Sequence, residues 1–160
     1  MTVVTRSPWQ TRCLAERIAA LLEPGDVVVL EGDLGAGKTA FVQGVAAALG
    51  IEEPVLSPTF VIIREYEGVL ALAHVDVYRL ESPAQLADLG LEELLDGTRV
   101  ALIEWGDRVR ALLPPDRLEV KIELGEAPED RHVTVRSEGI TWHRRRAGLE
   151  LALRIDGESV

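Results

Sequence analysis

The stretch "LEGDLGAGKTAFVQGV", Leu30 to Val45, places four small residues between an apolar run and an apolar, helix-forming segment. Glycine lowers the stability of regular structure, so a cluster of it usually serves a backbone conformation that other residues adopt poorly. Residues 32–39, "GDLGAGKT", match the pattern G-x-x-x-x-G-K-[ST] in full. The stretch therefore predicts a loop that binds phosphate groups.

The segments on either side of this loop give it the expected context. Residues 26–31, "DVVVLE", are a short apolar run typical of a strand buried on both faces. Residues 38–50, "KTAFVQGVAAALG", predict a helix that ends at its last glycine. In such a unit the loop N–H groups and the positive end of the helix dipole face the same anion. A glycine-rich turn without a ligand is the alternative, and the full match in this context argues against it.

The same motif gives roles to individual residues. We expect the Lys38 ammonium to reach the β- and γ-phosphates of a nucleotide and the Thr39 hydroxyl to ligate Mg²⁺. Nucleotide contacts are expected from the loop and the start of the helix, namely Asp33, Leu34, Gly35, Ala36, Gly37, Lys38, Thr39 and Ala40.

Two acidic residues in apolar strands are candidates for the metal and for catalysis. Glu104 lies near the end of a strand predicted over residues 99–105, and Asp76 lies within one predicted over residues 70–78. A carboxylate in a buried strand is costly unless it is paired or binds a metal, and Mg²⁺ prefers oxygen ligands. We assign Glu104 to the metal or to polarising the attacking water, and Asp76 to supporting the metal or orienting that water. A partner such as Arg79 is the alternative for Asp76, and a surface position at a strand end is the alternative for Glu104.

Other chemistry-bearing residues give weaker signals. Thr59, in "SPTF" (residues 57–60), could reach the γ-phosphate and Mg²⁺ as a switch loop does; an ordinary Ser-Pro turn is the alternative. The three histidines and one cysteine form no zinc pattern. His74 is expected to be a strand residue with an ordinary hydrogen bond, and Trp105 is expected to pack near the nucleotide pocket.

The remaining pattern predicts a single α/β domain over residues 1–160. Its mixed sheet is expected to combine parallel strands with an antiparallel portion, with helices on both faces. Ser7, Pro8 and Gln10 predict the capped start of a first helix. Strands are also expected over residues 59–66, 117–124 and 131–137, and short helices over 82–89, 91–97 and 107–114. The tail, residues 140–160, could be a helix or a short strand pair.

Composition and charge exclude several classes of protein. The 160 residues are 47% apolar, enough for a core, and the single cysteine, Cys13, fits a reducing compartment. No stretch approaches the roughly 20 consecutive apolar residues of a membrane span, so we expect a cytoplasmic protein. The net charge of −10 argues against a chain that holds nucleic acid alone. The basic run "HRRR", residues 143–146, is a local exception that could also be a solvated helix face.

Missing motifs narrow the choice of nucleotide. The chain has no Asn, and Lys121 is followed by Ile122 and Glu123, so the guanine-reading motif [N/T]-K-x-D is absent and ATP is the better expectation. The signature "SGGQ" of ABC ATPases is also absent. A small-molecule kinase stays open, with "DRVRALLP" (residues 107–114) as a short lid, and so does an ATP-gated binding module.

Four motifs of this chain resemble those of the TsaE (YjeE) family in their order and spacing, over about residues 7–137. They are "GDLGAGKT", "SPTF", "HVDVYRL" and "LIEW". The resemblance implies a small bacterial ATPase of tRNA threonylcarbamoyladenosine biosynthesis that binds ATP with Mg²⁺ and hydrolyses it slowly alone. It also implies action with a TsaB–TsaD pair that modifies adenosine 37 of tRNAs, with only indirect contact to tRNA.

By position, the resemblance gives Lys38 and Thr39 the roles that the phosphate-binding motif predicts. It gives Glu104 the metal role, Asp76 a catalytic or metal-supporting role and Thr59 the switch-like place. It also places Thr11 close to the nucleotide. Ala40 departs from the many loops of this kind that carry a second hydroxyl after the threonine.

Overall fold

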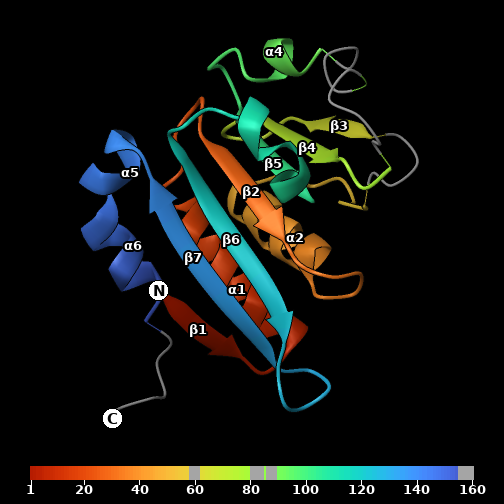
Figure 1. Ribbon diagram of the computed structural model, residues 1–160, viewed down its shortest axis with the longest axis vertical. Coiled ribbons are helices and arrows are strands. Elements are labelled where there is room, and N and C mark those ends of the chain that lie inside the picture. Colours follow the sequence, from red (N-terminus) through yellow and green to blue (C-terminus); the bar gives the residue numbers. More distant parts are fainter. Residues whose placement is uncertain (58–61, 80–84, 86–89, 155–160) are drawn as a thin grey trace.

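A mixed β-sheet forms the centre of the computed structural model (Figure 1), which describes residues 1–57, 62–79, 85 and 90–154. Within these residues the sheet has seven strands in the order β1-β7-β6-β2-β5-β4-β3. The strands are β1 Thr2–Thr5, β2 Val27–Glu31, β3 Ile63–Tyr66, β4 Leu72–Asp76, β5 Val100–Glu104, β6 Arg117–Leu124 and β7 Arg131–Glu138.

The sheet has a parallel middle and antiparallel edges. Strand β2 pairs in parallel with β5 on one side and β6 on the other, and β4 pairs in parallel with β5. Strand β3 is antiparallel to β4, β7 to β6, and β1 to β7. The prediction of a mixed sheet with an antiparallel portion is therefore confirmed. Because β2, β4 and β5 run in one direction, their carboxyl ends meet at the same edge of the sheet.

The helices are α1 Pro8–Ala19, α2 Lys38–Ala48, α4 Leu91–Leu94, the 3₁₀ helix η1 Gly106–Leu112, α5 Ile140–Arg144 and α6 Arg146–Ala152. Helix α1 begins as predicted: the Ser7 hydroxyl accepts a hydrogen bond from the Gln10 N–H at 3.1 Å, and Pro8 takes the first helical position. The helix expected at residues 107–114 is a 3₁₀ helix, and the one expected at 91–97 is the single turn α4. No described helix has the length and apolar character needed to cross a bilayer.

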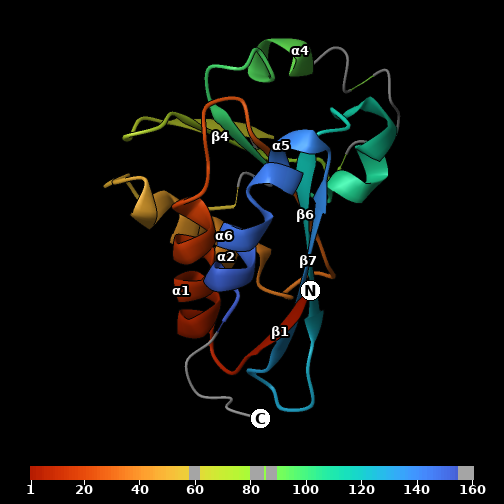
Figure 2. The same cartoon turned by 90° about the vertical axis from the view of Figure 1, so that its left-hand side faces the viewer.

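The two faces of the sheet are covered unequally. Residues Val28 and Leu30 of β2 pack into the core shared with α1, α2 and α6, whereas Val27 and Val29 face a smaller core on the other side. Figure 2 shows α1, α2 and α6 together on one side and the blue-green η1 on the opposite side. Helices thus lie on both faces, and among the described residues those on the second face are short.

Helices α1 and α2 approach each other closely because α2 carries a glycine at the contact. A Cβ added at Gly44 would lie 2.4 Å from the Arg12 carbonyl oxygen and 2.8 Å from the Ala15 Cβ. Any larger residue would push the helices apart. This contact holds α2, and therefore its first residue Lys38, against the rest of the fold.

The tail is helical as far as the structure describes it. Helices α5 and α6 bury Trp142 and Leu149 completely in the larger core, so the strand-pair alternative is wrong for residues 140–154. Two other predictions fall partly outside the described residues: the helix over 82–89, of which only residue 85 is described, and the strand over 59–66, which is described from residue 62.

Candidate functional site

The glycine-rich loop joins β2 to α2 at the carboxyl edge of the sheet. Gly32 has φ +146°, and a Cβ added there would lie 2.3 Å from the Ile122 carbonyl oxygen on β6. Gly35 and Gly37 also have positive φ angles, of +79° and +110°, where side chains are strained. The loop therefore needs glycine for its backbone path, and it leads directly into the N-terminus of α2 at Lys38.

A cavity of about 320 Å³ opens beside this loop. It lies where the carboxyl ends of β4 and β5 meet the start of α2. Residues from four separate parts of the chain line it: Leu34, Gly35, Gly37, Lys38, Thr39, Ser57, Asp76, Tyr78, Glu104 and Trp105. The fold therefore brings seven of the residues predicted for the site to one cavity.

The two predicted carboxylates lie side by side. Asp76 and Glu104 are paired positions of the neighbouring parallel strands β4 and β5, and both are almost fully buried. Glu104 Oε1 accepts a hydrogen bond from the Thr39 hydroxyl at 3.3 Å. The alternative of a surface position for Glu104 is therefore wrong.

This arrangement fits a magnesium ion that shares its coordination with phosphate groups. Thr39 and Glu104 offer the hard oxygen donors that Mg²⁺ prefers. Among the described residues, no cluster of three or more His, Cys, Asp or Glu side chains is arranged to hold a metal ion. The protein oxygens at this cavity would thus form only part of the coordination shell, with water and ligand oxygens completing it.

Asp76 is tied to both the loop after α2 and the end of β4. Its Oδ2 accepts a hydrogen bond from the Ser57 hydroxyl at 3.3 Å, and its Oδ1 accepts one from the Tyr78 N–H at 2.9 Å. These neutral donors hold the carboxylate at the cavity wall. Ser57 is the first residue of the "SPTF" segment, whose Thr59 lies outside the described residues.

Lys38 is buried at the cavity, with 5% of its surface exposed. Its ammonium donates hydrogen bonds to the carbonyl oxygens of Gly32 at 2.6 Å and Asp33 at 2.9 Å, and it lies 3.9 Å from the centroid of the Trp105 ring. Burial lowers the pKa of Lys38, while the nearby carboxylates, Glu104 first, oppose this shift. An anion in the cavity would favour the charged ammonium further.

Aromatic residues that follow the two carboxylates form a second wall. The rings of Tyr78 and Trp105 have centroids 4.9 Å apart, and Trp105 has φ +60°, which is unusual for a bulky residue. Arg108 donates a hydrogen bond to the Tyr78 carbonyl oxygen at 2.6 Å. The expected packing of Trp105 near the pocket is confirmed, whereas Tyr78 was not predicted, although it lies only two residues after Asp76.

Arg131 of β7 is a site residue that sequence reasoning missed. Its Nε donates a hydrogen bond to the Ala36 carbonyl oxygen at 2.8 Å. In a trans peptide the C=O and the next N–H point in opposite directions, so the Gly37 N–H points away from Arg131. Arg131 thereby helps to fix the orientation of one loop amide. No sequence signal could reveal this, because 95 residues separate the two partners.

The remaining predicted residues that the structure describes, Thr11, Asp33, Ala36 and Ala40, do not line the cavity. Thr11 is buried in α1, where its hydroxyl lies 2.8 Å from that of Thr5. Thr5 in turn is paired with Arg131 across β1 and β7. Asp33 and Ala36 offer their carbonyl oxygens to Lys38 and Arg131, and Ala40 lies in the first turn of α2.

The fold and the site together define an α/β protein with a glycine-rich strand-to-helix loop that faces a cavity at the carboxyl edge of parallel strands. A family model described as "Threonylcarbamoyl adenosine biosynthesis protein TsaE" matches residues 5–133. The chain belongs to the TsaE family, and the resemblance carried by its four motifs is confirmed.

Individual relatives agree with this family. The tRNA threonylcarbamoyladenosine biosynthesis protein TsaE of Bacillus subtilis (strain 168) is 46% identical over 136 residues, covering 84% of each chain. The protein of the same name from Treponema pallidum (strain Nichols) is 44% identical over 135 residues, covering 84% of this chain and 99% of the relative. The crystal structure of Bacillus subtilis YdiB matches with a TM-score of 0.79 and 39% identity, over 95% of this chain and 93% of that one.

Proposed function

We propose that this chain binds ATP with Mg²⁺ and hydrolyses it slowly alone, and that this cycle supports threonylcarbamoylation of adenosine 37 in tRNA. One observation carries the proposal: the glycine-rich loop, the Lys38 ammonium and the hydrogen-bonded pair of Thr39 and Glu104 meet at one cavity. A loop that binds phosphate, a buried cation and oxygen donors for a metal are the parts that Mg-ATP requires.

Each side chain has a task in this scheme. Lys38 exchanges its carbonyl partners in the loop for phosphate oxygens and brings a full positive charge to them. Thr39 and Glu104 would hold Mg²⁺, which when bound would neutralise charge on the phosphate oxygens. Asp76, beside Glu104 on the next strand, accepts a hydrogen bond from the attacking water and orients it.

The partner and the compartment belong to the same proposal. We propose that the chain acts with a TsaB–TsaD pair in the cytoplasm, and that these partners contact the tRNA. A net charge of −10 supports contact with proteins rather than direct binding to an RNA backbone.

The test is phosphate release from ATP by the purified chain, alone and with the TsaB–TsaD pair. We expect slow release that depends on Mg²⁺ and increases with the pair. Glu104→Gln should retain the fold but lose about 10²-fold or more in rate. The control Glu123→Gln, at an exposed residue of β6, should behave like the wild type.

Other results would contradict the proposal in distinct ways. Transfer of labelled phosphate from ATP to a metabolite would identify a kinase. Normal tRNA modification in cells that carry only the Glu104→Gln chain would identify an ATP-gated binding module. The absence of ATP binding by the wild type would remove both the site and the function.

A further inference from the structure

A buried histidine contacts the carboxylate assigned to the metal. His74 of β4 is completely buried, and its Nε2 lies 2.8 Å from Glu104 Oε1. This is the same oxygen that accepts the hydrogen bond from the Thr39 hydroxyl. One carboxylate oxygen is therefore occupied by two protein groups, and neither of them uses Oε2.

The hydrogen-bonding pattern indicates which ring nitrogen carries the proton. An ionised carboxylate only accepts hydrogen bonds, so Nε2 is the donor of the pair. The other nitrogen, Nδ1, is buried and has no hydrogen-bond partner among the described residues. A neutral ring with its hydrogen on Nε2 leaves only a lone pair unsatisfied there, rather than a buried N–H group.

The strand places His74 where it can act on the site. Successive side chains of a strand alternate between faces, so His74 and Asp76 lie on the same face of β4. Asp76 lines the cavity, whereas His74 does not. The histidine thus reaches the cavity only through Glu104.

We infer that His74 is a positioning residue for the metal carboxylate. Its Nε2–H fixes the Glu104 side chain beside the Thr39 hydroxyl and leaves Oε2 available to Mg²⁺ or to its bound water. The inference rests on the proposed function, because it needs a metal ion at this cavity. Outer hydrogen-bond partners of metal ligands typically contribute 10- to 100-fold to metal affinity.

The experiment measures how Mg²⁺ changes ATP binding, so it does not depend on hydrolysis. ATP is titrated into the full chain by calorimetry, first in EDTA and then at increasing Mg²⁺ concentrations. His74→Leu removes the donor and keeps an apolar side chain in the core. His74→Gln keeps an N–H donor near the position of Nε2. Leu72→Ala, a buried residue on the same strand and face, is the control for lost packing alone.

We expect His74→Leu to leave the Kd for ATP in EDTA unchanged and to raise the half-saturating Mg²⁺ concentration by about tenfold. His74→Gln should stay close to the wild type. Leu72→Ala should lower the melting temperature without changing the Mg²⁺ dependence.

The inference is overturned if His74→Leu keeps the Mg²⁺ dependence of the wild type, or if Leu72→Ala shifts it equally. It is also overturned if His74→Gln fails to restore the dependence. A wild type that binds ATP with no effect of Mg²⁺ would instead remove the proposed metal site, so the two failures are distinguishable.

Discussion

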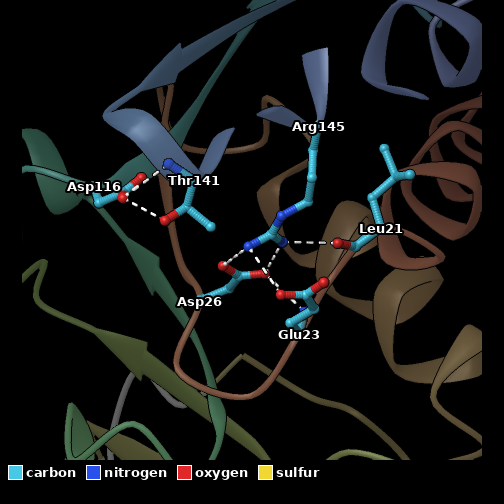
Figure 3. A network of polar contacts seen from close by, with 6 residues as sticks. All are labelled: Leu21, Glu23, Asp26, Asp116, Thr141 and Arg145. Atoms are coloured by element: carbon cyan, nitrogen blue, oxygen red, sulfur yellow. Dashed lines mark hydrogen bonds and ion pairs between the residues drawn. The ribbon is translucent and has the colours of Figure 1, made fainter. Parts of the chain in front are cut away.

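Two buried carboxylates, Asp26 and Glu104, lie at opposite ends of neighbouring parallel strands and have partners of different kinds. Asp26 precedes β2, and its two oxygens accept hydrogen bonds from the Arg145 guanidinium at 2.5 and 3.0 Å (Figure 3). Glu104 ends β5 and accepts hydrogen bonds from the Thr39 hydroxyl and the His74 ring. Within the part of the chain that the structure describes, Glu104 forms no ion pair with Arg or Lys.

The difference indicates what each carboxylate does. Arg145 neutralises Asp26, also donates to the Leu21 carbonyl oxygen at 2.8 Å, and lies 4.6 Å from the centroid of the Trp142 ring. These contacts tie the C-terminal helices to the turn before β2. Because no arginine or lysine among the described residues pairs with Glu104, this position suits a carboxylate that receives a cation from solution.

Three residues of the basic run at 143–146 lie on an exposed helix face, as one of its two interpretations predicted, and Arg145 is the exception. Arg145 is neither a contact for nucleic acid nor part of a solvated helix face, because it is largely buried against Asp26. Arg146 does lie on an exposed face, where it pairs with Glu150 at 2.9 Å.

The largest effect is expected from Arg145→Ala. Removing one partner leaves the Asp26 charge buried and unpaired, so we expect a loss of about 3 kcal/mol in the free energy of unfolding. The measurement is chemical denaturation. Arg146→Ala, at the exposed pair, should change stability by about 0.5 kcal/mol or less. If the Arg145→Ala chain bound ATP more weakly but kept the stability of the wild type, the contrast between a structural Asp26 and a ligand-binding Glu104 would be wrong.

Lys38→Ala is the matching change at the cavity. Loss of a charge-assisted contact worth about 1.5–3 kcal/mol should weaken ATP binding about 10- to 100-fold. Stability should not fall, since burial already disfavours the charged form of Lys38, as its lowered pKa indicates. Calorimetry gives the affinity, with Lys121→Ala on the exposed side of β6 as the control. Equal affinities in the Lys38→Ala chain and the wild type would refute the assignment of the loop to phosphate.

A smaller effect is expected from Arg131→Gln. The variant loses the Nε–H that donates to the Ala36 carbonyl oxygen, and the loop amides become less fixed. Since a single hydrogen bond contributes about 1 kcal/mol, ATP affinity should fall about fivefold. Arg136→Gln on the same strand is the control. An unchanged ATP affinity would mean that the glycine-rich loop keeps its conformation without the Arg131 contact from β7.

The smallest effect concerns acid stability at the C-terminal helices. The Thr141 hydroxyl, which donates to Asp116 at 2.5 Å, lowers the pKa of Asp116 below its ordinary value of 3.8 (Figure 3). A carboxyl group whose pKa is lower in the folded than in the unfolded chain stabilises the fold at pH values above its unfolded pKa. This stabilisation is lost as the pH falls through the pKa of the folded chain.

Thr141→Val should therefore lower the melting temperature at neutral pH and flatten its decline below about pH 4. Thermal unfolding followed across this range provides the measurement, with Thr134→Val, whose hydroxyl lies 3.0 Å from that of Thr2 and not beside a carboxylate, as the control. Parallel pH profiles for the Thr141→Val chain and the wild type would exclude this contribution.

The sequence alone determined the features that depend on neighbouring residues. The glycines of the loop, the Lys38–Thr39 pair, the cap at Ser7 and the apolar strand that ends in Glu104 are all local patterns, because backbone conformation and strand burial are encoded within a few positions. The pattern of four motifs was also sufficient to indicate the family.

Only the tertiary structure decided which distant groups meet. The pairing of Glu104 with His74, of Arg131 with Ala36 and of Asp26 with Arg145 joins residues 30, 95 and 119 positions apart. Such contacts follow from strand order and helix packing, and one-dimensional spacing contains neither. The charge of a carboxylate can be read from the sequence, but whether an arginine neutralises it depends on the fold.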